Sequence, residues 1–345
     1  MKILLVMDPG ILVPPEGYGG IERIVALLAE EYHRQGNEVD ILATRGSYVE
    51  GCATYPIGEK GFPPSKKEMN KAIITAWKFI RKNRNNYDLI HNFGRLLYLF
   101  PVLNHPVKKI MCYQREITAN NIRIYNLLPN KNIIFSGCSA DLVKRAAAPG
   151  RWVAIHNAVD FTKYCLRTSL ASDAPLIFLG RIERIKGCHT AIKVAKDTNN
   201  RLIIAGNKSS LPEEVSYFEK EIAPYIDNQQ IIYVGEVNNE QKNEWLGKSK
   251  ALLMPIEWNE PFGIVMIEAM ACGTPVIAFN KGSVNEVIEE NVTGFKVASE
   301  EEMICAVSKI NRIDRAGCRN FSCLKFNIPV IAGDYLNLFN SSKGK

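Results

Sequence analysis

The feature that most constrains the fold is an alternation between short apolar runs and longer segments with helical periodicity, which occurs twice along the 345 residues. Runs such as 2–7 and 176–179 are rich in Ile, Leu and Val, and the segments between them repeat apolar residues every three or four positions. This alternation predicts parallel strands that are buried on both faces, connected by helices. We therefore predict an α/β protein with two doubly wound domains.

The predicted elements divide into two sets. The first set has strands at 2–7, 38–43, 88–91, 109–113, 132–135 and 152–155, and helices at 21–35, 65–84 and 140–147. The second has strands at 176–179, 202–205, 231–234, 251–254 and 275–278, and helices at 187–199, 240–249, 263–272 and 300–310. The polar stretch 162–175 is the predicted linker. We expect domains at 1–163 and 164–320, and a closing helix within 321–345 that packs back toward the N-terminal domain.

Composition excludes several classes of protein. The net charge of +7 suits an anionic ligand or an anionic membrane surface, but the basic residues are too scattered for a nucleic-acid interface. None of the nine cysteines forms a C-x-x-C pair, so neither a zinc nor a redox motif is predicted. No run approaches the ~20 apolar residues of a membrane span. We expect a cytoplasmic protein.

Two loops at the ends of predicted strands carry glycines and cations. Gly19 and Gly20 precede helix 21–35, where backbone N–H groups can approach an anion, although these glycines alternatively serve the turn alone. The loop lacks the third glycine of a dinucleotide fingerprint. Arg181 and Lys186 follow strand 176–179; they suit a diphosphate or, alternatively, form a solvated basic turn.

The most informative segment is 255–277. Glu260 lies in a predicted loop, and Glu268 lies eight residues later within an apolar helix, where a buried carboxylate needs a partner. That partner is either a sugar or ribose hydroxyl or a structural ion pair. In a continuous helix the two carboxylates would be roughly 12 Å apart, farther than the about 5–5.5 Å of a retaining glycosidase. We interpret them as groups that hold two ends of one ligand.

Glu260 and Glu268 resemble the E-x7-E motif of the retaining GT-B glycosyltransferases of family four, the group one transferases. Three further segments occur in the same order along the chain as in this family: the Gly19-Gly20 loop, segment 180–187 and, after the Glu motif, segment 282–295. The resemblance implies a GT-B fold, in which two doubly wound Rossmann-like domains face each other across a cleft. It also implies a retaining, metal-independent transferase that moves a hexose-type sugar from a nucleotide diphosphate sugar to an acceptor hydroxyl. We expect a UDP-sugar donor, with a GDP-sugar as the alternative, whereas the acceptor stays open among saccharides, lipids and small molecules.

The same resemblance implies roles for residues and domains. Domain 1–163 would lie on the acceptor side, and domain 164–320 would bind the nucleotide sugar. Arg181 and Lys186 would bind the diphosphate, Glu268 the ribose hydroxyls and Glu260 the donor sugar. The implied catalytic residues are Glu260, His91, Arg181 and Lys186. The implied donor site is Gly19, Gly20, Arg181, Lys186, Val237, Glu260, Phe262, Gly263, Ile264, Val265 and Glu268. The implied acceptor-side residues are Tyr18, Arg95, Arg115 and Asn157.

Three of these assignments have a structural alternative. His91 ends strand 88–91, where the family often has a histidine that contacts the donor sugar, but it is alternatively a satisfied core histidine. Arg95 and Arg115 contact an anionic acceptor or the phosphates, or lie on the surface.

No cofactor is expected. The sequence has no Asp-x-Asp, the motif with which GT-A transferases hold a divalent metal, so cations and helix N-termini would stabilise the diphosphate.

The chain departs from the family pattern at two positions. Ala158 replaces the usual glycine of a Pro-Asn-Gly-Val-Asp segment, which predicts strain if that position requires a positive φ. Ser283 replaces the second glycine of the family's Gly-Gly-x-x-Glu. Both changes are expected to leave the fold intact and to reshape a ligand pocket.

The predicted helix 65–84 concerns where the protein lies in the cell. It carries Lys66, Lys67, Lys71, Lys78, Arg81, Lys82 and Arg84 beside apolar residues. A basic amphipathic helix can lie on the inner face of an anionic membrane, or it packs on a core with its charged face in water. A peripheral membrane contact is therefore an open hypothesis.

Other functions remain alternatives. A GT-B sugar-nucleotide epimerase would need no acceptor, and a degenerate nucleotide-sugar-binding protein would have lost the charged residues that this chain keeps. A phosphorylase needs a longer chain with a pyridoxal lysine, and a nicotinamide dehydrogenase needs a complete glycine fingerprint.

Overall fold

The computed structural model describes residues 1–17 and 19–340, which form two compact units. Unit 1 comprises residues 1–158 and the segment from 328 onward, and unit 2 comprises residues 159–327. The division falls at 158/159, five residues before the predicted boundary. The predicted linker lies within unit 2, where the Arg167 amide donates to the carbonyl of Cys272 (3.2 Å) and the Arg315 guanidinium donates to the carbonyl of Arg167 (2.6 Å).

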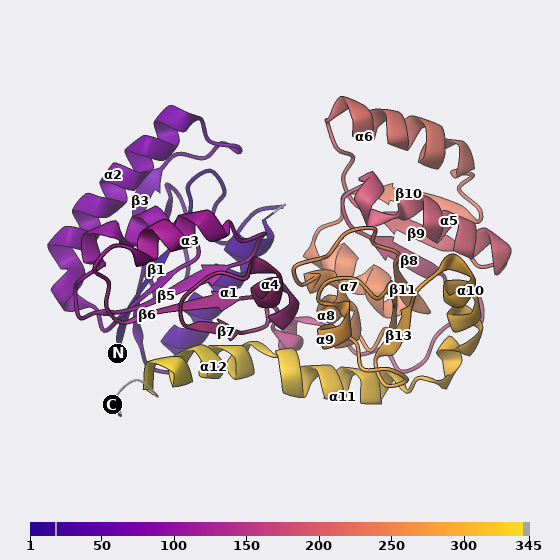
Figure 1. The fold of residues 1–345 in the computed structure, drawn as a ribbon. Helices are drawn as coiled ribbons and strands as arrows, with labels where there is room; N and C mark the ends of the chain where they lie inside the picture. Colours follow the sequence, from indigo (N-terminus) through magenta and orange to yellow (C-terminus); the bar gives the residue numbers. More distant parts are fainter. Residues whose placement is uncertain (18, 341–345) are drawn as a thin grey trace. The chain divides into compact units, whose positions relative to one another are not determined.

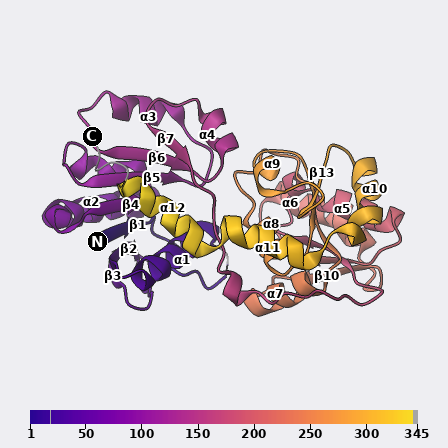
Figure 2. The same cartoon turned by 90° about the horizontal axis from the view of Figure 1, so that it is seen from below.

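Unit 1 is built on a seven-stranded parallel sheet with the order β3-β2-β1-β4-β5-β6-β7. Its strands are β1 (Lys2–Val6), β2 (Glu38–Thr44), β3 (Ala53–Gly58), β4 (Leu89–Asn92), β5 (Lys108–Tyr113), β6 (Ile133–Gly137) and β7 (Trp152–Ala154). Its helices are α1 (Gly20–Arg34), α2 (Lys66–Asn83), α3 (Ala119–Asn126), α4 (Ala140–Ala146) and α12 (Ile328–Asn340). Helices cover both faces of the sheet (Figures 1 and 2). The strand order reverses between β1 and β4.

Unit 2 contains a six-stranded parallel sheet with the order β10-β9-β8-β11-β12-β13. Its strands are β8 (Leu176–Leu179), β9 (Leu202–Ala205), β10 (Ile231–Gly235), β11 (Ala251–Met254), β12 (Val276–Phe279) and β13 (Gly294–Val297). Its α-helices are α5 (Cys188–Asp197), α6 (Pro212–Tyr217), α7 (Asn239–Lys248), α8 (Ile264–Ala271), α9 (Val284–Val287), α10 (Glu300–Lys309) and α11 (Arg315–Phe326). Here the order reverses between β8 and β11.

The predicted fold class of two doubly wound α/β domains is confirmed. Each predicted strand and helix is present to within two residues at either end, apart from the closing helix. Two strands were missed, β3 and β13. Both are edge strands, and β3 is largely exposed and contains Pro56, so neither has the continuous apolar run of a central strand.

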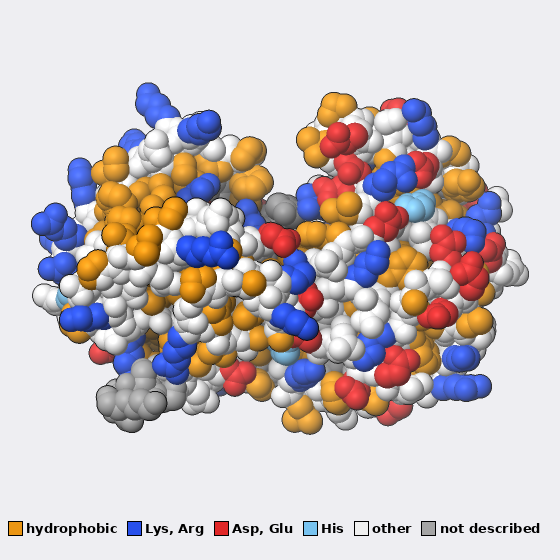
Figure 3. All heavy atoms as spheres, viewed as in Figure 1, with side chains coloured by type: hydrophobic (Ala, Val, Ile, Leu, Met, Phe, Trp, Pro, Cys, Tyr) orange, Lys and Arg blue, Asp and Glu red, His pale blue; other side chains and the backbone are white. Residues whose placement is uncertain are grey.

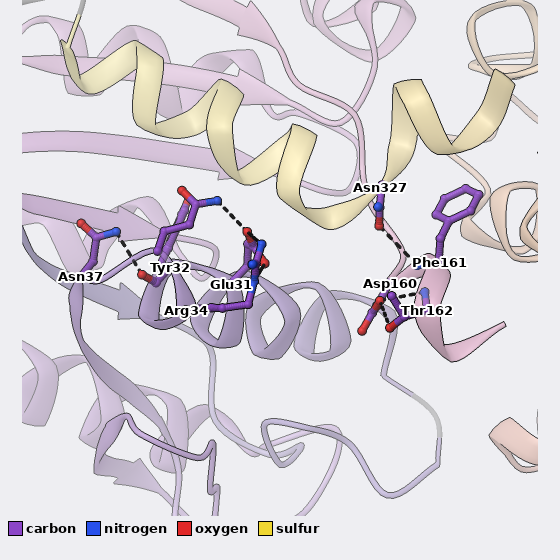
Figure 4. Close-up of polar contacts among 9 residues, drawn as sticks. Glu31, Tyr32, Arg34, Asn37, Asp160, Phe161, Thr162 and Asn327 are labelled. Atoms are coloured by element: carbon purple, nitrogen blue, oxygen red, sulfur yellow. Dashed lines mark hydrogen bonds and ion pairs between the residues drawn. The ribbon is translucent and has the colours of Figure 1, made fainter. Parts of the chain in front are cut away.

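The closing segment forms two helices rather than one. Helix α11 ends at Phe326, and the Asn327 side-chain oxygen accepts a hydrogen bond from the Phe161 amide at 3.3 Å (Figure 4). Pro329 follows in the first turn of α12, the position where a missing amide hydrogen is tolerated. The chain thus passes between the units at 158/159 and again at 327/328.

Helix α12 belongs to unit 1 and packs against β4 and β5. Figure 2 shows it lying across the strands of this sheet. The Tyr335 ring centroid is 4.5 Å from that of His91 on β4, and the Tyr335 hydroxyl is 3.1 Å from Cys112 Sγ on β5. The C-terminal helix therefore completes the core of the unit that contains the N-terminus.

Candidate functional site

The loops that carry the unit 2 motifs follow the two strands at which the sheet order reverses. Segment 180–187 follows β8, and segment 255–263 follows β11. In open α/β sheets, ligands bind outside the carboxyl ends of the strands at such a reversal. The topology therefore brings together two motifs that lie about 75 residues apart in the chain.

Backbone contacts hold these two loops against each other. The Glu257 amide donates to the carbonyl of Ile185 at 2.8 Å. Gly187 has a φ of +74°, and a Cβ at this position would lie 2.0 Å from the carbonyl oxygen of Pro255. Only glycine fits both the left-handed conformation and this close approach.

Lys186 and Glu260 form an ion pair at the junction of the loops. Lys186 Nζ donates to Glu260 Oε2 at 2.6 Å, and the two side chains are only 18% and 13% exposed. Trp258 Nε1 donates to the same oxygen at 2.9 Å, and its ring centroid lies 4.8 Å from Lys186 Nζ. The structure thus brings together two of the predicted catalytic residues.

Arg181 lies on the same loop as Lys186 and pairs with a different carboxylate. Its guanidinium lies 2.5 Å from Glu183 Oε1. Glu183 is buried and Arg181 is partly exposed, so the carboxylate holds a cation that solvent still reaches. The loop therefore presents two cations at the carboxyl end of β8, an arrangement that suits a diphosphate.

Glu268 is buried within α8 and is 5% exposed. Its Oε1 accepts hydrogen bonds from the Tyr164 hydroxyl (2.9 Å) and from Lys242. The carboxylate is thus satisfied inside the protein, as the ion-pair alternative expected. Its position one turn into the helix that follows the Glu260 loop still suits a hydroxyl ligand.

The start of α8 is shaped by the loop after β12. Gly263 caps the helix with a φ of +75°. The Ser283 hydroxyl donates to the carbonyl of Phe262 at 2.8 Å, and the Ser283 amide donates to that of Glu260 at 3.0 Å. A Cβ on Gly282 would lie 2.3 Å from the Glu260 carbonyl oxygen. The serine that departs from the family pattern therefore supports the loop that carries Glu260.

The remaining predicted donor residues differ in what their side chains can reach. Phe262 is buried and packs edge-on against Phe326 at 6.0 Å, so its side chain is part of the core. Ile264 and Val265 lie in the first turn of α8 and are partly exposed. Val237 lies in the loop after β10 and is also partly exposed. Solvent thus reaches all three residues other than Phe262.

His91, which was predicted to contact the donor sugar, is buried in the core of unit 1. Its exposed fraction is 0%, and its ring lies 4.3 Å from that of Phe93 and 4.5 Å from that of Tyr335. Nδ1 is 3.3 Å from the Tyr32 hydroxyl. Burial lowers the pKa of His91 to about 3, so the ring is neutral. Its strand lies in the middle of the sheet, and α12 covers that face.

The other predicted residues of unit 1 lie in several places. Gly19 precedes α1 with a φ of +149°, and a Cβ there would meet the Pro15 ring at 2.7 Å, so the turn itself requires glycine. Gly20 is the first residue of α1. Asn157 is 4% exposed. Tyr18 lies outside the described residues.

Arg95 and Arg115 line a pocket of about 480 Å³ at the carboxyl ends of β1, β4 and β5. The sheet order of unit 1 reverses between β1 and β4, so this pocket occupies the ligand position of the first sheet. Asp8, which directly follows β1 and also lines the pocket, was missed in the sequence, although its place just after a strand would have indicated it.

Lys242 and Tyr164, the partners of Glu268, were also missed. Nothing in the sequence spacing connects them to Glu268, because they lie 26 and 104 residues away.

The strain considered for Ala158 does not arise, since its φ is not positive. Over residues 1–17 and 19–340, no three His, Cys, Asp or Glu side chains gather where they could hold a metal ion. Metal independence stays a prediction.

Two family models match this chain. The model described as "Glycosyl transferases group 1" matches residues 170–314, and the model described as "Glycosyltransferase Family 4" matches residues 18–113. The first therefore covers most of unit 2, with Arg181, Lys186, Glu260 and Glu268, and the second covers more than half of unit 1.

Individual relatives agree with these models. An uncharacterized 41.2 kDa protein in the cps region of Klebsiella pneumoniae is 30% identical over 48% of this chain and 46% of its own length, so the match spans less than half of that relative. The lipopolysaccharide 1,2-N-acetylglucosaminetransferase of Salmonella typhimurium is 28% identical over 91% of this chain and 89% of its own.

A solved structure shows the same fold. Anabaena HepE, in complex with UDP and glucose, superposes with a TM-score of 0.75 at 16% identity, covering 99% of this chain and 100% of that one. At this identity the likeness concerns the fold alone. With matched family models in both halves and two doubly wound units of the GT-B type, this chain belongs to the group 1 glycosyltransferases of family 4.

Proposed function

We propose that this protein transfers a hexose-type sugar from a nucleotide diphosphate sugar to an acceptor hydroxyl, with retention of the anomeric configuration and without a metal. One observation carries the proposal: Lys186 pairs with Glu260 at the strand-order reversal of unit 2, and Arg181 lies on the same loop as Lys186. Cations suit the diphosphate, and a carboxylate suits the sugar hydroxyls. HepE binds UDP, which favours a UDP-sugar for this chain, with a GDP-sugar as the alternative.

In the proposed reaction, the bond between the anomeric carbon and the β-phosphate oxygen breaks, and its electron pair stays on the phosphate. Arg181 and Lys186 stabilise the charge of the leaving diphosphate, together with the N-terminus of α8 at Gly263 and Ile264. The acceptor oxygen bonds to the same face of the sugar, and its proton passes to the departing phosphate. Glu268 holds the ribose hydroxyls, and the nucleotide base lies near Val237.

A thermal-shift panel of nucleotide sugars in the presence of EDTA tests the donor site. A ligand that binds the folded state raises the melting temperature by mass action. We expect one donor to stabilise the wild type without metal, and Arg181→Ala and Glu268→Ala to lose the shift. Arg312→Ala and Glu301→Ala, which remove exposed charges of the same unit, are matched controls that keep it. No shift with any donor, or a shift that requires a divalent metal, would overturn the proposal.

Product analysis then separates transfer from epimerisation. We expect turnover of the donor into a glycoside only when an acceptor is added. An epimerised nucleotide sugar formed without any acceptor would instead establish the epimerase, and donor binding without turnover would establish a degenerate binding protein.

We also propose that α2 makes a peripheral contact with an anionic membrane. This helix exposes six cations, namely Lys66, Lys67, Lys71, Lys78, Arg81 and Lys82. Its opposite face is buried and consists of Met69, Ala72, Ile73, Ala76 and Ile80. No ion pair joins these six cations to any residue in 1–17 or 19–340. Over the same residues, no helix combines the length and apolar character that crossing a bilayer requires.

A further inference from the structure

The unit 1 pocket has an unusual wall for a protein that would bind only sugars. Apolar side chains form much of its lining, including Phe93, Leu97, Phe100, Ile124 and Leu128. Its volume of about 480 Å³ lies within the roughly 300–1,000 Å³ typical of small-molecule sites. The pocket shares no residue with the donor motifs of unit 2.

Part of this wall is open to water. Leu97, Phe100 and Ile124 are 43%, 42% and 62% exposed. Figure 3 shows apolar side chains gathered over α3 and toward α2, with Lys and Arg along the outer edge. A contiguous exposed apolar surface that is surrounded by polar residues often marks a binding site. An apolar ligand group would remove this surface from water.

The wall is held in place without a ligand. Trp77 on α2 donates its indole N–H to the carbonyl of Leu97 at 2.7 Å. The Trp77 and Phe100 rings stack with centroids 5.9 Å apart and an interplanar angle of 23°. A preformed wall lowers the ordering cost of binding.

The other end of the pocket is polar. Asp8 Oδ1 is buried and has no hydrogen-bond partner in the described part of the chain, and Arg95 Nε lies 3.9 Å from it. Burial raises the pKa of the Asp8 carboxyl, and the charge of Arg95 opposes this rise. A buried carboxylate oxygen without a donor is costly, so a ligand hydroxyl would satisfy it. Arg115 adds a second cation to the lining.

We propose that this pocket binds a lipid-linked acceptor, with its hydroxylated head group at Asp8 and its hydrocarbon chain along Leu97, Phe100 and Ile124. The inference rests on the proposed function, because it names the acceptor class of that reaction. A free saccharide would satisfy Asp8 but would leave the apolar wall in water. A lipid with a hydroxylated head group and a hydrocarbon chain matches both ends of the pocket.

Titration calorimetry with methyl, hexyl and octyl β-D-glucopyranoside below their critical micelle concentrations tests this assignment. Each buried methylene contributes about 0.8 kcal/mol, which corresponds to about fourfold in affinity. We expect octyl glucoside to bind at least tenfold more tightly than hexyl glucoside, and methyl glucoside to bind most weakly. The comparison along the chain-length series depends little on which head group the natural acceptor carries.

A double variant locates the effect. Leu97→Ser with Ile124→Ser should lower the affinity for octyl glucoside at least tenfold while leaving methyl glucoside unchanged. Leu211→Ser with Leu324→Ser replaces two exposed apolar residues of unit 2 and is the control. Because all four side chains are exposed, we expect both variants to fold.

The outcomes separate the two proposals. Equal affinity along the alkyl series, or equal loss in the control variant, overturns the lipid-linked acceptor. If a nucleotide sugar still stabilises the same protein, the proposed transferase survives that failure. If no nucleotide sugar binds, the proposed function fails whatever the alkyl glucosides show.

Discussion

Lys186 Nζ lies 2.6 Å from Glu260 Oε2, although 74 residues separate the two in the chain. The pair joins the loop after β8 to the loop after β11 at the point where the sheet order reverses. In the absence of a donor, each charge thus compensates the other. A diphosphate would bring a second anion to Lys186, and the sugar hydroxyls would reach Glu260.

Removing one member of this pair should cost stability. We expect Lys186→Met to lower the free energy of unfolding by up to about 3 kcal/mol, because it leaves a largely buried carboxylate unpaired. Lys186→Met combined with Glu260→Gln should recover part of that loss. Lys193→Met removes an exposed lysine that pairs with Glu300 and should cost much less than Lys186→Met. Urea denaturation measures all three, and equal costs for the two single variants would contradict the expectation.

Gly282 should resist substitution more than an unconstrained glycine. Gly282→Ala adds the strain of a φ of +59° to a contact with the Glu260 backbone, so we expect a loss of about 3 kcal/mol or more. Gly235 has a φ of +76° with no atom within 4 Å of its Cβ position. Gly235→Ala should therefore cost only about 1–2 kcal/mol. Thermal denaturation compares the two variants. A loss of stability for Gly282→Ala no larger than that for Gly235→Ala would show that the loop moves to accommodate the methyl group.

Glu268→Gln should weaken donor binding, and it should also cost stability because it removes the anionic partner of the largely buried Lys242. The amide keeps the shape and accepts a hydrogen bond from Lys242, but a neutral acceptor binds a hydroxyl less strongly than a carboxylate. We expect about tenfold weaker binding of UDP, which corresponds to about 1.4 kcal/mol. The exposed Glu244→Gln on α7 is the control. Calorimetric titration with UDP decides, and unchanged affinity would leave Glu268 a purely structural residue.

His91 should make stability depend on pH. Because its pKa is about 3 in the folded state and about 6.5 when unfolded, the unfolded chain binds the extra proton between these values. The stabilisation is complete above pH 6.5 and is lost as the pH falls toward 3. Between pH 7 and pH 5, the free energy of unfolding should fall by about 2 kcal/mol from this group alone.

His91→Gln should remove that part of the pH dependence, as measured by urea denaturation at both pH values. His33→Gln, which replaces an exposed histidine of α1, should keep the wild-type dependence. If His91→Gln keeps the wild-type slope, the buried ring is not the origin of the effect.

The cations of α2 should determine binding to anionic lipid. We expect the wild type to float with liposomes that contain phosphatidylglycerol, and the triple variant Lys66→Gln, Lys67→Gln, Lys71→Gln to bind about a hundredfold more weakly, at about 1 kcal/mol per charge. Replacing the exposed Lys220, Lys248 and Lys309 of unit 2 by Gln keeps the overall charge change the same and should have little effect. A wild type that does not float would remove the membrane proposal.

The sequence by itself determined the fold class, most of the elements and the family, but not the short helices α3, α6 and α9. Short apolar runs and helical periodicity are local properties, so they survive without knowledge of tertiary contacts. Segments 180–187 and 255–263 could be identified for the same reason, because strand ends, glycines and charged residues lie close together in the chain. The edge strands β3 and β13 were missed because neither has the continuous apolar run that identifies a central strand.

Tertiary structure decided what each functional side chain touches. The sequence placed His91 at a strand end, but only the packing of α12, more than 230 residues later, buries it. It placed Glu268 in an apolar helix, but Lys242 and Tyr164 reach that carboxylate from α7 and from the segment after β7. Asp8 and Arg95 meet in one pocket because parallel pairing sets β1 beside β4. These contacts join residues that are distant in the chain, so they cannot be predicted from spacing along the sequence.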